Sequence, residues 1–275
     1  MSEFSGHLSV RAAARANGRT ALTAQSFRAP YHLSKPYWDA DAGVLLVQVV
    51  NPTAGILSGD RLESDIAVEA KAALLVTTPS ASRVFKMKEG TAECRQRFSV
   101  ASGGWLEVMP EPLVPHRGSR YRQVTSVEVE SGGALFFVDQ LACGRVAHGE
   151  TWAWDRLCLE IDLRLAGELI LRERLDQSGE SLRALAELAG SGPAACFANA
   201  VLVAPESSLG TAPWRDAISA LHGEGLWVGV SNLRHGGWSL KFVASDAVKL
   251  RRVLRASRKI LTPYFPRLAC EPRKL

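Results

Sequence analysis

Two acidic residues, Asp139 and Glu173, occupy matching places in a pattern that recurs along this 275-residue sequence. The pattern is a strand, a short turn of small residues and a second strand, and its four copies are VEAKAALLVTT, VASGGWLEVMP, VESGGALFFVD and LAGELILRERL. The copies align on a shared leucine, which is Leu74, Leu106, Leu135 or Leu169. Four residues later, where each second strand is expected to end, stand Thr78, Pro110, Asp139 and Glu173. Since equivalent positions of a stacked array lie above one another, we expect the two carboxylates to line the same side of the body.

Paired carboxylates allow more than one kind of chemistry. Glycoside hydrolysis uses two acids about 5–9.5 Å apart across a cleft, so a β-solenoid carbohydrate-active hydrolase is one interpretation. That hypothesis requires an open, aromatic-lined groove with Trp152 or Trp154 beside the acids. The simpler alternative is that both acids form ordinary ion pairs with Arg145, Arg172 or Arg174. The sequence supplies no distance, so both interpretations stay open.

Other catalytic and metal-binding signatures are missing from the sequence. It contains no G-x-S-x-G, H-E-x-x-H, Walker A or G-x-G-x-x-G motif. The histidines are isolated from one another, and the five cysteines are scattered without a C-x-x-C pair. We therefore expect reduced thiols, no closed zinc site and no stably bound cofactor.

The composition is that of an ordinary soluble globular protein, with 47% hydrophobic and 22% charged residues. No apolar run approaches the ~18–20 residues of a membrane span. The first residues lack the apolar stretch of a signal peptide, which predicts a cytoplasmic location. The formal net charge is +5, but acidic and basic residues alternate except between residues 249 and 259. We expect neither a nucleic-acid nor a membrane partner.

The elements that must position these residues are mainly strands. Residues 157–165 alternate apolar and polar side chains, and residues 44–50 form a nearly continuous apolar run, which suits a strand buried on both faces. The strand–turn–strand pattern recurs every ~30 residues, which is typical of stacked arrays. We therefore predict a mainly β, stacked body that is β-helix-like, or sandwich-like if evenly spaced hairpins form two sheets. No linker is visible, so one domain is expected over residues 1–275.

Two α-helices are predicted near the C-terminus. The first spans residues 213–222, and Gly223 is well placed to end it. The second spans residues 245–261, with Ser245 as a possible cap and an apolar stripe of Leu250, Val253, Leu254, Ser257 and Leu261. Its basic face carries Lys249, Arg251, Arg252, Arg255, Arg258 and Lys259. We expect this face to be solvated, and a binding site for an acidic partner or a polyanion is the alternative.

The segment NPTAGILSGD, residues 51–60, is a glycine-bearing loop in which Asp60 can accept hydrogen bonds from nearby backbone amides. It is one of six motifs that occur in the order RAPYHLSKPYW, NPTAGILSGD, ASRVFK, LEVMPE, CGRVAHGE and LRASRKILTPYF. Together these motifs resemble the UreD family of urease accessory proteins, also called UreH, and the resemblance extends over nearly the whole chain. The chain departs from the usual family pattern at Ala54, Ser58 and Val108.

The resemblance implies a non-catalytic urease maturation factor with a β-helix-like body and two helices. Such a protein is expected to be a scaffold and metallochaperone that docks on apo-urease together with the helical partner UreF and the nickel-carrying GTPase UreG. Nickel would be a transient cargo that crosses an interior passage lined by polar groups. The matching positions here are Asp60, Ser82, Asp139 and Glu173. The resemblance also implies structural roles for the motif residues Asn51, Gly55, Gly59, Gly144, Arg145, Gly149 and Glu150.

Overall fold

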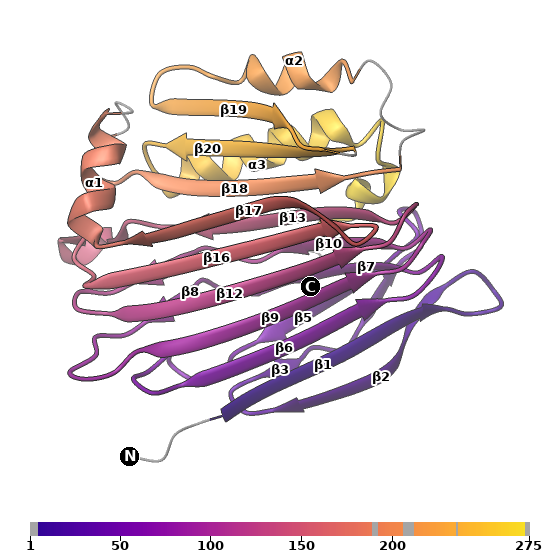
Figure 1. The fold of residues 1–275 in the computed structure, drawn as a ribbon, viewed down its shortest axis with the longest axis horizontal. Helices are drawn as coiled ribbons and strands as arrows, with labels where there is room; N and C mark the ends of the chain where they lie inside the picture. Colours follow the sequence, from indigo (N-terminus) through magenta and orange to yellow (C-terminus); the bar gives the residue numbers. More distant parts are fainter. Residues whose placement is uncertain (1–4, 189–191, 206–211, 235, 273–275) are drawn as a thin grey trace.

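Two β-sheets face each other, and α-helices lie behind the second sheet (Figure 1). The computed structural model describes residues 5–188, 192–205, 212–234 and 236–272. Sheet 1 contains, in spatial order, β17 (Glu168–Gln177), β16 (Arg156–Leu165), β12 (Arg120–Val129), β9 (Ala92–Val100), β6 (Arg61–Val68), β1 (Ser5–Ala14) and β2 (Thr20–Arg28). Sheet 2 contains β19 (Leu226–Asn232), β20 (Gly237–Ala244), β18 (Cys196–Val203), β13 (Ala134–Leu141), β10 (Trp105–Met109), β7 (Ala73–Thr77), β5 (Val44–Val50) and β3 (His32–Leu33). Short strands at its margin are β4 (Tyr37–Asp39), β8 (Ser82–Val84) and β11 (Leu113–Pro115).

Parallel stacking of three strand–turn–strand units forms the middle of both sheets. Each unit sends its first strand into sheet 1 and its second into sheet 2, as in β6 to β7, β9 to β10 and β12 to β13. Leu106 pairs with Leu74 on one side and with Leu135 on the other, which confirms the predicted alignment of these three residues. The turns stack too, because the Gly103 amide donates to the Gly132 carbonyl oxygen at 3.0 Å. The body is therefore a stacked, β-solenoid-like arrangement, as predicted.

The fourth predicted unit is different, and its alignment on Leu169 was wrong. Ala166 and Gly167, which connect β16 to β17, both have positive φ angles, of 51° and 84°. A two-residue turn with two positive φ angles matches the twist of an antiparallel hairpin, so the chain returns within the same sheet. β17 therefore pairs antiparallel with β16 at the edge of sheet 1. Glu173 consequently lies in sheet 1, opposite the sheet that carries Asp139.

Sheet 2 is buried on both faces, which explains its continuous apolar strands. In β7, Leu74 and Val76 belong to the core between the two sheets, whereas Ala73 and Leu75 belong to the core behind sheet 2. The rear core is closed by α2 (Trp214–Ser219) and α3 (Ala247–Leu261), so both predicted helices are present. The fold thus has three layers, and side-chain alternation decides which strand residues face the space between the sheets.

The start of α3 differs in detail from the prediction. The Asp246 side chain, not that of Ser245, caps the helix by accepting a hydrogen bond of 2.8 Å from the Lys249 backbone amide. The Ser245 hydroxyl instead donates to the Asp246 carboxylate at 3.2 Å. An extended Asp at this position satisfies a free amide of the first turn and places negative charge at the positive end of the helix.

One residue of the expected solvated face, Arg258, is buried. Its side chain donates to both carboxylate oxygens of Glu107 on β10, at 2.9 and 3.1 Å, and to the Cys270 carbonyl oxygen at 2.8 Å. Arg258 and Glu107 are 4% and 0% exposed, so the ion pair is removed from water. This pair fixes α3 and the segment after it to sheet 2.

A third helix, α1 (Gly179–Leu188), was not predicted. Its signals are present in the sequence: Ser178 caps it by accepting from the Ser181 amide at 3.2 Å, and Arg183 pairs with Glu187 one turn later.

Among the residues that the structure describes, no helix has the length and apolarity to cross a membrane.

Candidate functional site

Two cavities lie between the sheets and share a wall. The first has a volume of about 230 Å³ and extends among β5, β6, β7, β9 and the loop after β5. The second has a volume of about 540 Å³ and extends among β16, β17, β18, β20 and α1. The shared wall residues are Leu113, Gln123, Asp139 and Gln140. The two cavities are therefore neighbours, and Asp139 lies in the wall between them.

Asp139 faces the interior because of its place on β13. Leu135 and Phe137 of the same strand pack in the core between the sheets, and the period of two puts Asp139 on the same face. Burial raises the pKa of Asp139 to about 7, a hydrogen bond from Gln123 opposes this rise, and the negative charge of Glu173 adds to it. Asp139 can thus exchange a proton near neutral pH, which an ordinary surface carboxylate does not do.

A polar row crosses the inner face of sheet 2 from Asp139. In the strand register Asp139 pairs with Asn199 of β18, and Asn199 pairs with Lys241 of β20. The Lys241 ammonium lies 2.6 Å from a carboxylate oxygen of Glu173 on sheet 1 and 3.5 Å from the Asn199 side-chain oxygen. Asp139, Asn199, Lys241 and Glu173 all line the second cavity. The structure therefore brings the two predicted carboxylates into one cavity, from opposite sheets.

A second polar row crosses the inner face of sheet 1. Its cross-strand neighbours are Ser64, Gln96 and Thr125, and the apolar Ile161 separates them from Glu173 at the edge of the sheet. The Thr125 hydroxyl donates to the Gln96 side-chain oxygen at 3.2 Å, and the Tyr121 hydroxyl donates to that of Gln123 at 3.1 Å. The interior surface of sheet 1 near the first cavity is thus lined by neutral oxygen-bearing groups.

The first cavity also holds a buried thiol. Cys94 lies 3.9 Å from the Tyr31 hydroxyl, and both residues line the cavity. Burial raises the pKa of Cys94 to about 11, so the thiol is protonated at neutral pH.

Sequence reasoning missed Asn199 and Lys241, although each left a signal. Asn199 is the single polar side chain of the strand CFANAVLV, and Lys241 is the single charged side chain of GWSLKFVA. A single polar residue in an otherwise apolar strand must find a partner or water inside the protein. Which partner it finds was not visible, because Glu173 is 68 residues from Lys241 in the sequence.

The other two predicted passage residues have different positions. Ser82 begins β8 and lines the first cavity. Asp60 is 5% exposed and accepts a hydrogen bond of 2.8 Å from the Leu57 amide, as expected for a turn. Burial also raises the pKa of Asp60. Asp60 lines neither cavity. Its contact with Leu57 instead supports the loop that forms part of the wall of the first cavity.

That loop is held against β8 by backbone contacts. The Ile56 amide donates a hydrogen bond of 2.8 Å to the Arg83 carbonyl oxygen. A Cβ atom at Gly55 would lie only 2.6 Å from that Arg83 oxygen, so the close approach requires glycine. The Asn51 side chain accepts from the Thr53 amide at 3.0 Å. Gly59, with a φ angle of 80°, permits the turn that Asp60 closes. Asn51 and Gly55 both line the first cavity.

The motif CGRVAHGE forms a small closed unit next to the cavities. Arg145 donates two hydrogen bonds to Glu150, at 3.1 and 2.8 Å, across the ladder of β14 (Gly144–Arg145) and β15 (Glu150–Thr151). Gly149 ends the intervening 3-10 turn (Val146–His148) in a left-handed conformation. These contacts give the motif residues structural positions and occupy Arg145, which is therefore not the partner of either interior carboxylate.

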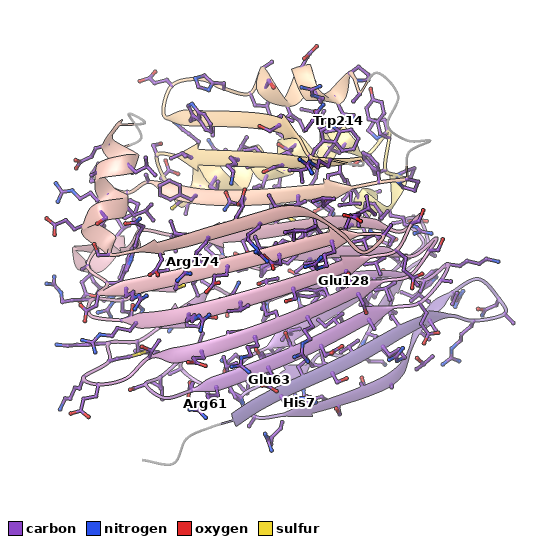
Figure 2. All side chains as sticks on the ribbon, in the orientation of Figure 1. His7, Arg61, Glu63, Glu128, Arg174 and Trp214 are labelled. Atoms are coloured by element: carbon purple, nitrogen blue, oxygen red, sulfur yellow. The ribbon has the colours of Figure 1, made fainter. Side chains whose placement is uncertain are left out.

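The outer face of sheet 1 carries charges that pair with each other across strands. Figure 2 shows Arg61, Glu63, Glu128 and Arg174 on this face. Three ion pairs join neighbouring strands, namely Arg122–Glu160, Arg156–Asp176 and Arg172–Asp162, and a fourth, Arg174–Asp176, lies within β17. Arg172 and Arg174 thus form ion pairs with acids other than Asp139 and Glu173.

The groove required for a glycosidase is not formed by the predicted tryptophans. Trp152 and Trp154 are 5% and 3% exposed and pack against each other in a core cluster. Glu173 is paired with Lys241, and Asp139 on the facing sheet lies beside Asn199. The geometry gives the hydrolase interpretation no support.

Fold and site together define a stacked β scaffold with a polar internal space, and comparison with known proteins assigns its family. The UreD urease accessory protein family matches residues 5–274. The chain is 66% identical to the urease accessory protein UreD of Opitutus terrae over 273 residues, which are 99% of this chain and 100% of the relative. It is 34% identical to UreD of Yersinia enterocolitica over 215 residues, covering 74% of this chain and 65% of the relative. The chain therefore belongs to the UreD family of urease accessory proteins, which implies a role in urease maturation.

Proposed function

We propose that this protein is a non-catalytic scaffold and metallochaperone that conducts Ni²⁺ through its interior toward the active site of apo-urease. In this proposal it docks on apo-urease in the cytoplasm together with UreF and UreG, and nickel is its transient cargo. The observation that carries the proposal is the wall that two cavities share at Asp139. Ser64, Gln96 and Ser82 supply polar groups to the first cavity, and Asn199, Lys241 and Glu173 supply them to the second. In the proposed passage a cation crosses from one cavity to the other beside Gln123 and Asp139, which line both.

The donor set suits transit rather than storage. Carboxylate and amide oxygens bind Ni²⁺ more weakly than imidazole or thiolate ligands. Among the described residues, no group of three or more His, Cys, Asp or Glu side chains is placed to hold a metal ion. Ser82 offers a hydroxyl in the first cavity, and Asp139 and Glu173 offer carboxylates in the second. Asp60 contributes by holding the loop that forms a wall of the first cavity.

Asp139 couples cation passage to proton release. Its pKa of about 7 means that a proton occupies the carboxyl group about half of the time at neutral pH. A dication that reaches Asp139 favours the ionised form, so the proton leaves as the cation binds. When the cation moves on, reprotonation removes the negative charge that would hold the next cation too long.

The rim of the second cavity supports contact with a protein partner. Leu185 on α1 and Trp227 on β19 both line this cavity, and they are 55% and 43% exposed. Large exposed apolar side chains beside an opening are typical of protein–protein contact sites. In the proposed complex a partner covers this rim, so the cation does not enter bulk water.

The test replaces passage residues and measures nickel in urease. Asp139→Asn and Glu173→Ala change residues that line the cavities, and Asp60→Ala loosens the loop that forms a wall of the first cavity. Each should lower the nickel content and activity of urease matured in cells, while pull-down still recovers UreF, UreG and apo-urease. Asp162→Asn is the matched control, because Asp162 lies on the outer face of sheet 1 and pairs with Arg172 at 2.6 Å. Normal nickel loading by both the Asp139 and Glu173 variants would overturn the passage, and failure to recover the partners with the unchanged protein would overturn the scaffold role.

A further inference from the structure

Lys241 places a covalently attached cation in the cavity through which a metal cation is proposed to move. Its ammonium group contacts Glu173 at 2.6 Å, and the pair joins the inner faces of the two sheets across the second cavity. The outer-face pair of Arg172 with Asp162 does not line this cavity. We propose that Lys241 is a tethered counter-cation that a dication must displace from Glu173, and that it thereby keeps binding in the cavity weak and reversible. This inference rests on the proposed function.

The electrostatics of the cavity require such a partner. Asp139 and Glu173 share the cavity, and the charge of Glu173 already contributes to the raised pKa of Asp139. Lys241 neutralises Glu173 in the absence of cargo, so the cavity does not hold two uncompensated negative charges. An entering dication competes with the Lys241 ammonium for the Glu173 carboxylate. Its net binding free energy is therefore only the difference between the dication–carboxylate and the ammonium–carboxylate interaction.

The chemistry of lysine suits a displaceable group. The Lys241 side chain is 44% exposed, whereas that of Glu173 is 25% exposed, so the ammonium has access to water when it leaves the carboxylate. The Asn199 side-chain oxygen, 3.5 Å away, offers a neutral second partner on the same row. Lysine is a point charge on a flexible stem, whereas arginine holds a carboxylate with a rigid two-pronged contact. A monovalent cation has the same charge as the ammonium and gains little by exchange, so the pair favours dications.

The experiment measures the binding of Ni²⁺ to the purified full chain by isothermal titration calorimetry. Lys241→Met keeps a long unbranched side chain and removes the charge, so it should bind Ni²⁺ at least about tenfold more tightly than the unchanged protein. Adding Glu173→Gln to Lys241→Met should abolish this gain. Arg172→Met is the control, because it breaks an ion pair of the same strand on the outer face and should leave the affinity unchanged.

The possible outcomes separate the inference from the function on which it rests. Equal or weaker Ni²⁺ binding by Lys241→Met, with binding that still depends on Glu173, would overturn the counter-cation role and leave the passage standing. Binding that neither Asp139→Asn nor Glu173→Gln changes would overturn the passage itself. Should Lys241→Met fail to fold, as judged by circular dichroism, Lys241→Arg provides the second test. Arginine should hold Glu173 more firmly and weaken Ni²⁺ binding, so tighter binding by that variant would contradict the inference.

Discussion

Replacing Asp139 by Asn should stabilise the protein above neutral pH even though it impairs the proposed passage. The carboxyl group lies between the sheets, where burial raises its pKa from 3.8 to about 7. The folded protein therefore holds this proton more tightly than the unfolded chain does. Below the pKa of the unfolded chain the carboxyl group is protonated in both states, so it does not change the stability. As the pH rises from that pKa through the pKa of the folded protein, the free energy of unfolding falls.

The magnitude follows from the size of the shift. Roughly three pKa units at about 1.4 kcal/mol each give a penalty of about 4 kcal/mol when the pH exceeds 7. The same relation gives about 3 kcal/mol at pH 6 and close to zero at pH 3. Asparagine has nearly the same shape, cannot ionise and can still form a hydrogen bond with Gln123. The gain in stability from Asp139→Asn should therefore grow with pH and level off above pH 7.

Urea unfolding at several pH values, between the acid limit of the folded state and pH 8, measures this gain. Asp162→Asn is a suitable control, because its hydrogen bonds with Arg172 lower the pKa of Asp162. A surface pair of this kind contributes about 0–1 kcal/mol, and its loss should give no gain at any pH. A stabilisation by Asp139→Asn that does not increase with pH would refute the reasoning, since it would show that the carboxyl group is not held in its neutral form.

Two further predictions concern contacts that hold the scaffold together. Arg258→Met should lower the free energy of unfolding by about 3–5 kcal/mol in urea unfolding, because it leaves Glu107 buried and unpaired. Adding Glu107→Gln should restore most of this loss. A loss below about 1 kcal/mol in the single variant would contradict this account. Gly144→Ala should lower the melting temperature more than Gly149→Ala. Both glycines have positive φ angles, so both substitutions strain the backbone. A Cβ at Gly144 would also collide with the Glu150 carbonyl oxygen, whereas a Cβ at Gly149 would have nothing within 4 Å. The reverse order in thermal unfolding would count against the close approach of β14 and β15.

Much of the stacked body was predictable, because its signals are local and repeat. The alignment of Leu74, Leu106 and Leu135 from the turn pattern is the register observed in sheet 2. Parallel stacking places equivalent residues next to each other, so a repeat in sequence becomes a ladder in space. The stripe of α3 and the run 44–50 were likewise predictable from periodicity alone.

The family resemblance came from ordered motifs, but their roles depended on tertiary contacts. Asp60 shares the motif with the cavity-lining residues Asn51 and Gly55, yet its own carboxylate closes a turn. Arg258 belongs to a basic run in the sequence, yet its partner Glu107 lies 151 residues away and removes it from water. A residue type and its neighbours in sequence do not specify which side chain will lie opposite after folding.

The sequence by itself determined the β architecture, the two C-terminal helices and the acidic residues worth testing. Only the tertiary structure decided how those acids meet. Glu173 was aligned with Asp139 as a stacked equivalent, but the hairpin at Ala166 and Gly167 keeps it in sheet 1. The two carboxylates still share a cavity because the inner faces of two sheets oppose each other there, with Lys241 between them in the polar row. Strand periodicity encodes which face a side chain occupies, whereas contacts between sheets depend on how the whole chain packs.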